Sequence, residues 1–200
     1  MPATNADLHG NAPDKSAAAL LLIDLINDLE FPEGDQLLGE TLPILPQIVA
    51  LKRQAKAAGV PVIYVNDNFG RWQSNFNTQV AHCLHDGVRG QPIAEQLQPE
   101  DDDYFVLKPK HSGFFSTTLD TLLEYLQVRR VILTGIAGNI CVLFTANDAY
   151  LRDLALYVPA DCVASNTQEE NTHALRQMQR VLKADIRPST ALDLRSLQRR

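Results

Sequence analysis

The chain has 200 residues, of which 45% are hydrophobic and 21% are charged, and its formal net charge is -6 at pH 7. This length suits one domain, and the negative charge argues against nucleic acid or an anionic membrane as a partner. The longest apolar run, AAALLLI at 17–23, is far shorter than the roughly 20 residues of a membrane span, and the polar N-terminus lacks the apolar segment of a secretory signal. The three cysteines are odd in number and form no CxxC pair, so we expect reduced thiols in a cytoplasmic protein.

The chain reads as one regular domain between two short terminal segments. Residues 1–16 lack periodicity, which predicts a flexible arm or an extension over a neighbouring subunit. The domain spans 17–190 and a C-terminal tail follows at 191–200, whose basic end RSLQRR is expected to be a solvated terminus. Apolar runs predict strands at 17–25, 61–67, 104–108, 130–135, 155–161 and 184–187. Helical spacing predicts helices at 42–60, with Gly59 as its stop, and at 115–127, 139–153 and 168–182.

Strands that are apolar throughout and alternate with helices indicate a parallel sheet covered on both faces. We therefore predict a doubly wound α/β fold with a mainly parallel six-stranded sheet in the Rossmann-like order 3-2-1-4-5-6. Ligands bind such sheets at the carboxyl ends of the strands, near the point where the strand order reverses. The less regular segment 67–103, which holds the only tryptophan, is expected to cover or shape that site.

Three chemically reactive side chains, Asp24, Lys108 and Cys141, follow or end predicted strands. Each alone has an ordinary explanation, as a turn residue, a surface lysine and a core-filling thiol. In the predicted strand order the first and fourth strands are neighbours, so Asp24 and Cys141 would face one crevice. We expect Lys108 and the helix N-terminus to stabilise the thiolate, while Asp24 moves its proton. The set predicts a nucleophilic cysteine.

Four stretches carry a family resemblance: LLLIDLINDLEFPEG at 20–34, VIYVNDNFGRW at 62–72, VLKPKHSGFFSTTLDTLL at 106–123 and ILTGIAGNICV at 132–142. With them the chain resembles the isochorismatase-like superfamily of cysteine hydrolases over about residues 17–190. The resemblance implies that Asp24, Lys108 and Cys141 are the catalytic residues. Lys110 competes with Lys108, but LKPKHSGFF matches the family's Lys-Pro-x-x-Ser-x-Phe best with Lys108 as the catalytic lysine.

The resemblance also implies details of the turn before Cys141. It implies a cis peptide bond between Ile136 and Ala137, and an oxyanion hole formed by the backbone N–H groups of Ala137 and Cys141. Many members carry threonine where this chain has Gly138. We expect the side-chain contact of that threonine to be lost or replaced, with Asn139 as one candidate for the replacement.

Other positions bear on metal and substrate. Nicotinamidases of the superfamily have an Asp-x-His metal motif after the second strand, whereas this chain has Asp67, Asn68 and Phe69, so we expect no metal and no cofactor. The substrate pocket is expected to include Asn27, Phe31, Asn68, Trp72 and Phe115. Competing explanations are turn formation for Asn27 and core or interface packing for the aromatic residues.

The sequence therefore predicts a metal-independent cysteine hydrolase that cleaves a C–N bond of a small amide, ureide or carbamoyl compound through a thioester. Two alternatives stay open. One is hydrolysis of a vinyl ether, and the other is a non-catalytic binding or scaffold member, for which Gly138 is the main motivation. Relatives commonly form dimers or larger rings, so a homo-oligomer is expected, with neither nucleic acid nor a membrane as partner.

Overall fold

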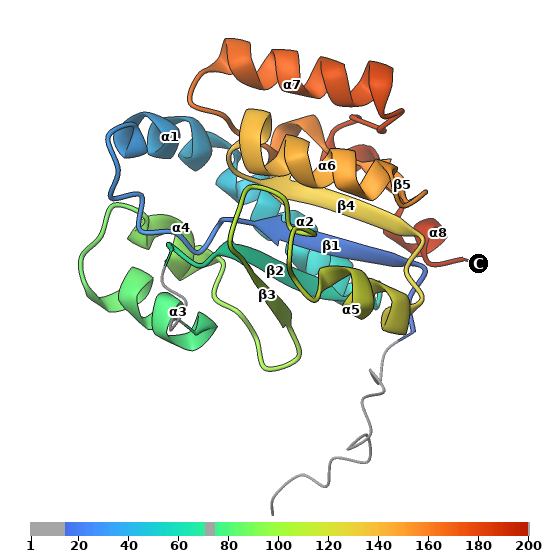
Figure 1. Ribbon diagram of the computed structural model, residues 1–200, viewed down its shortest axis with the longest axis horizontal. Helices are drawn as coiled ribbons and strands as arrows, with labels where there is room; N and C mark the ends of the chain where they lie inside the picture. Colours follow the sequence, from blue (N-terminus) through green and yellow to red (C-terminus); the bar gives the residue numbers. More distant parts are fainter. Residues whose placement is uncertain (1–14, 71–74, 200) are drawn as a thin grey trace, which may run out of the picture.

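The computed structural model describes residues 15–70 and 75–199, and its centre is a single parallel sheet (Figure 1). Its five strands lie in the order β3-β2-β1-β4-β5, and every neighbouring pair is parallel. The strands are β1 (Ala18–Ile23), β2 (Val62–Asp67), β3 (Tyr104–Lys108), β4 (Arg130–Gly135) and β5 (Ala155–Tyr157). The predicted doubly wound α/β class is confirmed, and β1 and β4 are neighbours as expected.

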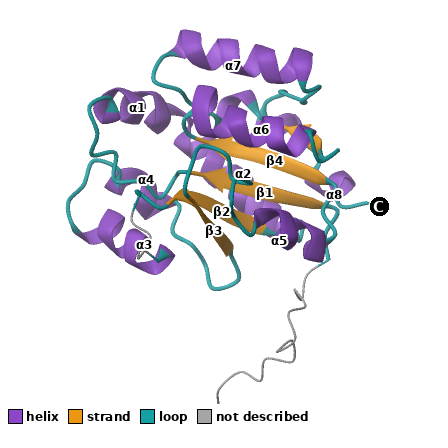
Figure 2. Ribbon diagram, in the orientation of Figure 1, coloured by secondary structure: helices purple, strands orange, loops and turns teal. Residues whose placement is uncertain are grey.

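Helices cover both faces of this sheet (Figure 2). They are α1 (Gly34–Thr41), α2 (Leu45–Ala57), α3 (Phe76–His85), α4 (Gln91–Gln96), α5 (Leu119–Leu126), α6 (Leu143–Tyr150), α7 (Gln168–Val181) and α8 (Leu194–Leu197). Short turns of 3-10 helix lie at Leu42–Ile44, Ala160–Cys162 and Ser189–Ala191. The predicted helices at 42–60, 115–127, 139–153 and 168–182 correspond to α2, α5, α6 and α7.

The apolar side chains of β1 explain the two-sided burial. All six of its residues are buried, and successive side chains point to opposite faces of the sheet. Ala18, Leu20 and Leu22 pack with α2, α4 and α8, whereas the alternate residues of the strand pack with α5, α6 and α7. A strand buried on both faces needs apolar residues at every position, which is the pattern that the sequence shows.

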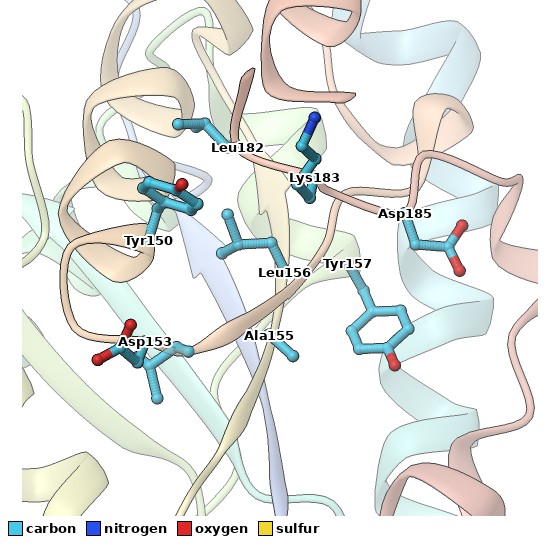
Figure 3. A pocket seen from close by; sticks show the side chains of 9 residues that line it. Tyr150, Asp153, Ala155, Leu156, Tyr157, Leu182, Lys183 and Asp185 are labelled. Carbon is cyan, nitrogen blue, oxygen red and sulfur yellow. The ribbon is translucent and has the colours of Figure 1, made fainter. Parts of the chain in front are cut away.

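The predicted sixth strand at 184–187 is wrong as a strand, because it is reduced to one bridge between Tyr157 and Asp185. Lys183 has a left-handed φ of 59° and Pro188 has no N–H to donate, so the pairing ends on both sides of Asp185. A pocket of about 400 Å³ opens along the edge of β5, where Lys183 and Leu156 line it (Figure 3). None of the candidate catalytic residues lines this pocket.

The segment expected to be irregular, 67–103, contains α3 and α4. Residues 1–14 of the predicted N-terminal arm lie outside the described residues, while Ser16 is buried and its N–H donates to Leu126 O at 2.8 Å.

The expectation of a solvated C-terminal tail is wrong, because Leu194 and Leu197 of α8 are buried in the core. Within the described ranges we find no helix that is both long enough and apolar enough to cross a membrane.

Candidate active site

Asp24 lies directly after β1, at the carboxyl end of the sheet. Its φ of 53° turns the chain away from the strand, and its N–H donates to Val65 O at 3.0 Å. The side chain is buried, and its Oδ1 accepts a hydrogen bond of 2.7 Å from the N–H of Asp67. The backbone of the neighbouring strand β2 therefore holds the Asp24 carboxylate in place.

Lys108 is the last residue of β3, and its side chain is fully buried. Because β2 lies between β3 and β1, the side chain reaches across the end of β2 to the residue after β1. Its Nζ lies 2.9 Å from Asp24 Oδ2 and 3.5 Å from Asp67 Oδ2. The two carboxylates explain how an ammonium group is accommodated in a buried position, because buried charges need charged or hydrogen-bonding partners.

Cys141 is placed by the turn that follows β4. Gly135 has a φ of 111°, and a Cβ at this position would lie 2.0 Å from Ile23 O, so only glycine fits. The next peptide bond, between Ile136 and Ala137, is cis. A short π-helical turn, Gly138–Val142, then leads into α6 and carries the half-buried Cys141.

The Cys141 sulfur completes a compact group of three side chains. Lys108 Nζ donates to Cys141 Sγ at 3.4 Å, and the Asp24 carboxylate, which lies 2.9 Å from the same Nζ, acts on the pKa of the thiol. Residues 24, 108 and 141 come from the ends of three strands, so the fold brings together side chains that are far apart in the sequence. A thiol, a carboxylate and an ammonium within hydrogen-bond reach form the arrangement needed to activate a nucleophile.

The protonation states follow from burial and from the charges in the group. Burial raises the pKa of the Cys141 thiol to about 12; the negative charge of Asp24 adds to the rise and Lys108 opposes it. Burial also raises the pKa of Asp24, against the opposing effect of Lys108. For Lys108, burial acts to lower the pKa, but the charges of Asp24, Cys141 and Asp67 outweigh it, and the pKa is raised. Burial thus favours a protonated thiol in the free protein, whereas Lys108 acts in the opposite direction and favours the thiolate.

The backbone of the turn offers N–H groups close to the sulfur. Several of them already donate within the protein: Gly138 to Ala164 O at 2.7 Å, Asn139 to Ser165 Oγ at 3.0 Å, and Ile140 and Val142 to Ala137 O at 3.0 and 3.1 Å. These bonds fix the course of the chain from residue 137 to residue 142. The N–H groups of Ala137 and Cys141 lie within this fixed segment.

The expected pocket residues have mixed outcomes. Asn27 Oδ1 accepts the N–H of Leu29 at 2.9 Å, as the competing turn explanation predicts. Asn68 is buried, and its Oδ1 accepts the N–H of Gly70 at 2.9 Å. Both asparagines therefore stabilise their own loops through their side-chain oxygens.

The aromatic residues expected in the pocket are more exposed. Phe31 and Phe115 are 36% and 54% exposed, while Trp72 lies outside the described residues. The residue that sequence reasoning missed is Asp67, which contacts Lys108 and binds Asp24 through its N–H. Its position at the end of a predicted strand was the signal that could have identified it.

The donor set after β2 gives no support to a metal site. Asp67 is followed by Asn68 and Phe69, and a phenyl ring offers no ligand atom. Across the part of the chain that the structure describes, no group of three or more His, Cys, Asp or Glu side chains is arranged to hold a metal ion.

These features define an α/β protein with a buried cysteine, aspartate and lysine at the carboxyl end of a parallel sheet. The model of the isochorismatase domain matches residues 18–186, so the chain belongs to the isochorismatase family of hydrolases, which act on small molecules. The isochorismatase family protein YaaI of Bacillus subtilis is 48% identical over 172 residues, which cover 86% of this chain and 94% of YaaI.

Two further similarities include named activities. Ureidoacrylate amidohydrolase RutB of Yersinia enterocolitica is 30% identical over 161 residues, covering 68% of this chain and 70% of RutB. The crystal structure of N-carbamoylsarcosine amidase from Thermoplasma acidophilum superposes with a TM-score of 0.67 at 25% identity, and covers 88% of this chain and 98% of that protein.

Proposed function

We propose that this protein is a cysteine amidohydrolase that cleaves a C–N bond of a small carbamoyl, ureido or amide compound. The observation that carries the proposal is the buried group in which Lys108 Nζ lies 3.4 Å from Cys141 Sγ and 2.9 Å from Asp24 Oδ2. The similarity to a ureidoacrylate amidohydrolase and to an N-carbamoylsarcosine amidase supports the substrate class. No step of the proposed reaction uses a metal ion or a cofactor.

In the first half of the reaction Asp24 takes the thiol proton as the sulfur of Cys141 attacks the substrate carbonyl carbon. The C–N bond then breaks, the nitrogen leaves as an amine or ammonia with the proton from Asp24, and the acyl or carbamoyl group stays on sulfur. Lys108 stabilises the thiolate and holds Asp24 in position. The N–H groups of Ala137 and Cys141 stabilise the oxyanion, where a well-placed donor contributes about 3–4 kcal/mol.

In the second half, water attacks the thioester carbonyl carbon with Asp24 as the base. The C–S bond breaks, the acid product leaves, and the proton returns to Cys141. One water is consumed, and the thiol is regenerated. The raised pKa of Asp24 suits this exchange of protons, because an efficient acid and base has a pKa closer to the working pH than a surface carboxyl has.

The test is turnover of a panel of N-carbamoyl amino acids, ureidoacrylate and simple amides, followed by release of ammonia or amine. Cys141→Ala should abolish turnover, and acid-quenched wild type should show the mass of an acyl or carbamoyl group on the peptide that contains Cys141. Cys83→Ala is the matched control, because Cys83 is a buried core thiol on α3. Full turnover by Cys141→Ala would refute the mechanism, and loss of turnover in both variants would show a general effect of removing a thiol.

A further inference from the structure

The space beside Gly138 is filled by an amide side chain from α7. A Cβ atom at Gly138 would lie 2.4 Å from Asn171 Oδ1, 2.6 Å from Val163 Cγ1 and 2.9 Å from Ser165 Oγ. All three distances are too short for a real Cβ contact. The absence of a side chain at Gly138 therefore leaves the space in which the Asn171 amide lies.

A chain of hydrogen bonds links Asn171 to the backbone of the turn. The Ser165 hydroxyl donates to Asn171 Oδ1 at 3.1 Å, and the N–H of Asn139 donates to Ser165 Oγ at 3.0 Å. Asn171 Nδ2 donates to Val163 O at 2.8 Å. The amide thus uses both of its ends, and the chain of bonds reaches the backbone two residues before Cys141.

The groups in this chain are themselves held firmly. Ser165 is 1% exposed, so its hydroxyl has no competing bulk water. Asn171 is in the first turns of α7, whose start is fixed by the Thr167 side chain accepting the N–H of Glu170 at 3.2 Å. The N–H of Asn171 donates to Thr167 O at 3.0 Å. A rigid helix start therefore presents the amide to the turn.

We infer that Asn171 is a positioning residue, which acts through Ser165 and through its contact with Gly138 to fix the turn from Ala137 to Cys141. Asn171 acts on the backbone of the turn and takes no part in the chemical steps. Its kinetic consequence rests on the proposed function, because the turn carries the two N–H groups assigned to the oxyanion. Such donors are effective only when they are held in place before the reaction, and a displacement of about 1 Å costs up to roughly 100-fold in rate.

The structural half of the inference is tested by hydrogen exchange, which needs no substrate. In Asn171→Ala, the backbone amides of residues 138–142 should exchange about tenfold faster, as expected when one buried hydrogen bond is lost. Ser165→Ala breaks the same chain while leaving the Asn171 amide beside Gly138, and it should give the same increase at Asn139. The control is Thr172→Ala, since the Thr172 hydroxyl bonds only to Gln168 O of its own helix in the structure. Equal exchange in wild type, Asn171→Ala and Ser165→Ala would overturn the inference.

The kinetic half uses whichever N-carbamoyl compound of the panel the wild type hydrolyses. Asn171→Ala should lower kcat by roughly 10- to 100-fold and change KM by less than about twofold, as for partners that orient a reacting group. Gly138→Ala should also lower kcat, because its methyl group collides with Asn171. In the double variant the shortest collision is gone, so the combined loss should be smaller than the product of the two single losses.

The outcomes separate this inference from the proposed function. If the wild type hydrolyses no compound of the panel, the proposed function fails, and hydrogen exchange alone decides the role of Asn171. If the wild type is active but Asn171→Ala keeps both its exchange pattern and its kcat, the inference fails and the function stands. If the loss of kcat in the double variant equals the product of the two single losses, the contact between positions 138 and 171 is not the cause of the loss in Gly138→Ala, and this part of the inference is overturned.

Discussion

Replacing Lys108 by methionine removes the ammonium group but keeps a side chain of similar length in the same buried space. The Nζ lies 2.9 Å from Asp24 Oδ2, and at an effective dielectric constant of about 20 this pair has a Coulomb energy of about 6 kcal/mol. Desolvation of both groups offsets part of that energy. Removal of one partner of a buried pair lowers the free energy of unfolding by about 3–5 kcal/mol, and we expect a loss in this range at neutral pH.

The loss should depend on pH in a definite direction. Burial raises the pKa of Asp24, and Lys108 opposes that rise, so the pKa of Asp24 should be still higher in Lys108→Met. A carboxyl with a higher pKa in the folded chain contributes stability below its unfolded pKa of about 4, and that contribution is lost as the pH rises through the folded pKa. The variant should therefore be more strongly destabilised at about pH 8 than at about pH 5.

Urea unfolding followed by circular dichroism at both pH values measures this difference. The double variant Lys108→Met and Asp24→Asn is the control, because it removes the unpaired carboxylate as well as the ammonium. It should be more stable than Lys108→Met at about pH 8 and should show less dependence on pH. Equal destabilisation at the two pH values, together with no recovery in the double variant, would refute the view that Lys108 compensates the buried charge of Asp24.

Further predictions follow from the other titrating groups. Because Asp24 raises the pKa of Cys141 and Lys108 lowers it, the rate of Cys141 alkylation by iodoacetamide at about pH 8 should rise in Asp24→Asn and fall in Lys108→Met; the opposite order would contradict the charge assignment. The hydrogen bond to Asp86 raises the pKa of His82, whose side chain is 41% exposed. His82→Gln should therefore lower the free energy of unfolding by less than about 1 kcal/mol at pH 6 and leave it unchanged at pH 9. A loss of more than about 1 kcal/mol at pH 6 would contradict a solvent-screened ion pair. Dialysis against EDTA should leave the proposed hydrolysis unchanged, and a loss that zinc restores would show that a metal takes part.

The strands were predictable because their signal is strong and local. A strand buried on both faces carries a continuous apolar run, which spans all of β1, residues 62–65 of β2 and residues 131–133 of β4. The sixth strand failed because pairing with β5 is confined to Asp185, between the left-handed φ of Lys183 and the proline at 188. Composition does not report that conformation.

Two of the helices missed by the sequence analysis differ in how they could have been found. For α3, Asn75 accepts the N–H of Thr78 and precedes apolar residues at helical spacing, so an N-cap signal was present in the sequence. For α1, the eight residues GDQLLGET include two glycines, and no side chain caps the first turn. Its helix depends on tertiary packing of Leu37, which a sequence does not display.

For the site, the proximity of the three side chains was predictable from the sequence, but the protonation of the thiol was not. Parallel strands end at one edge of the sheet, so residues after β1 and β4 and at the end of β3 were predictably close. The state of the thiol was not predictable, because it depends on how deeply Cys141 is buried. Burial is the largest influence on its pKa and exceeds the effect of the ammonium that the sequence analysis relied on.

A protonated resting thiol is consistent with the proposed reaction because the proton transfer conserves the charge of the buried group. Before transfer, Lys108 compensates the Asp24 carboxylate at 2.9 Å; afterwards, Asp24 is neutral and the same ammonium compensates the Cys141 thiolate at 3.4 Å. At an effective dielectric constant of about 20, the two ion pairs differ in Coulomb energy by only about 1 kcal/mol. One fully buried lysine within reach of both groups can thus serve both protonation states. In the proposed reaction the thiolate then needs to form only when a substrate carbonyl is present.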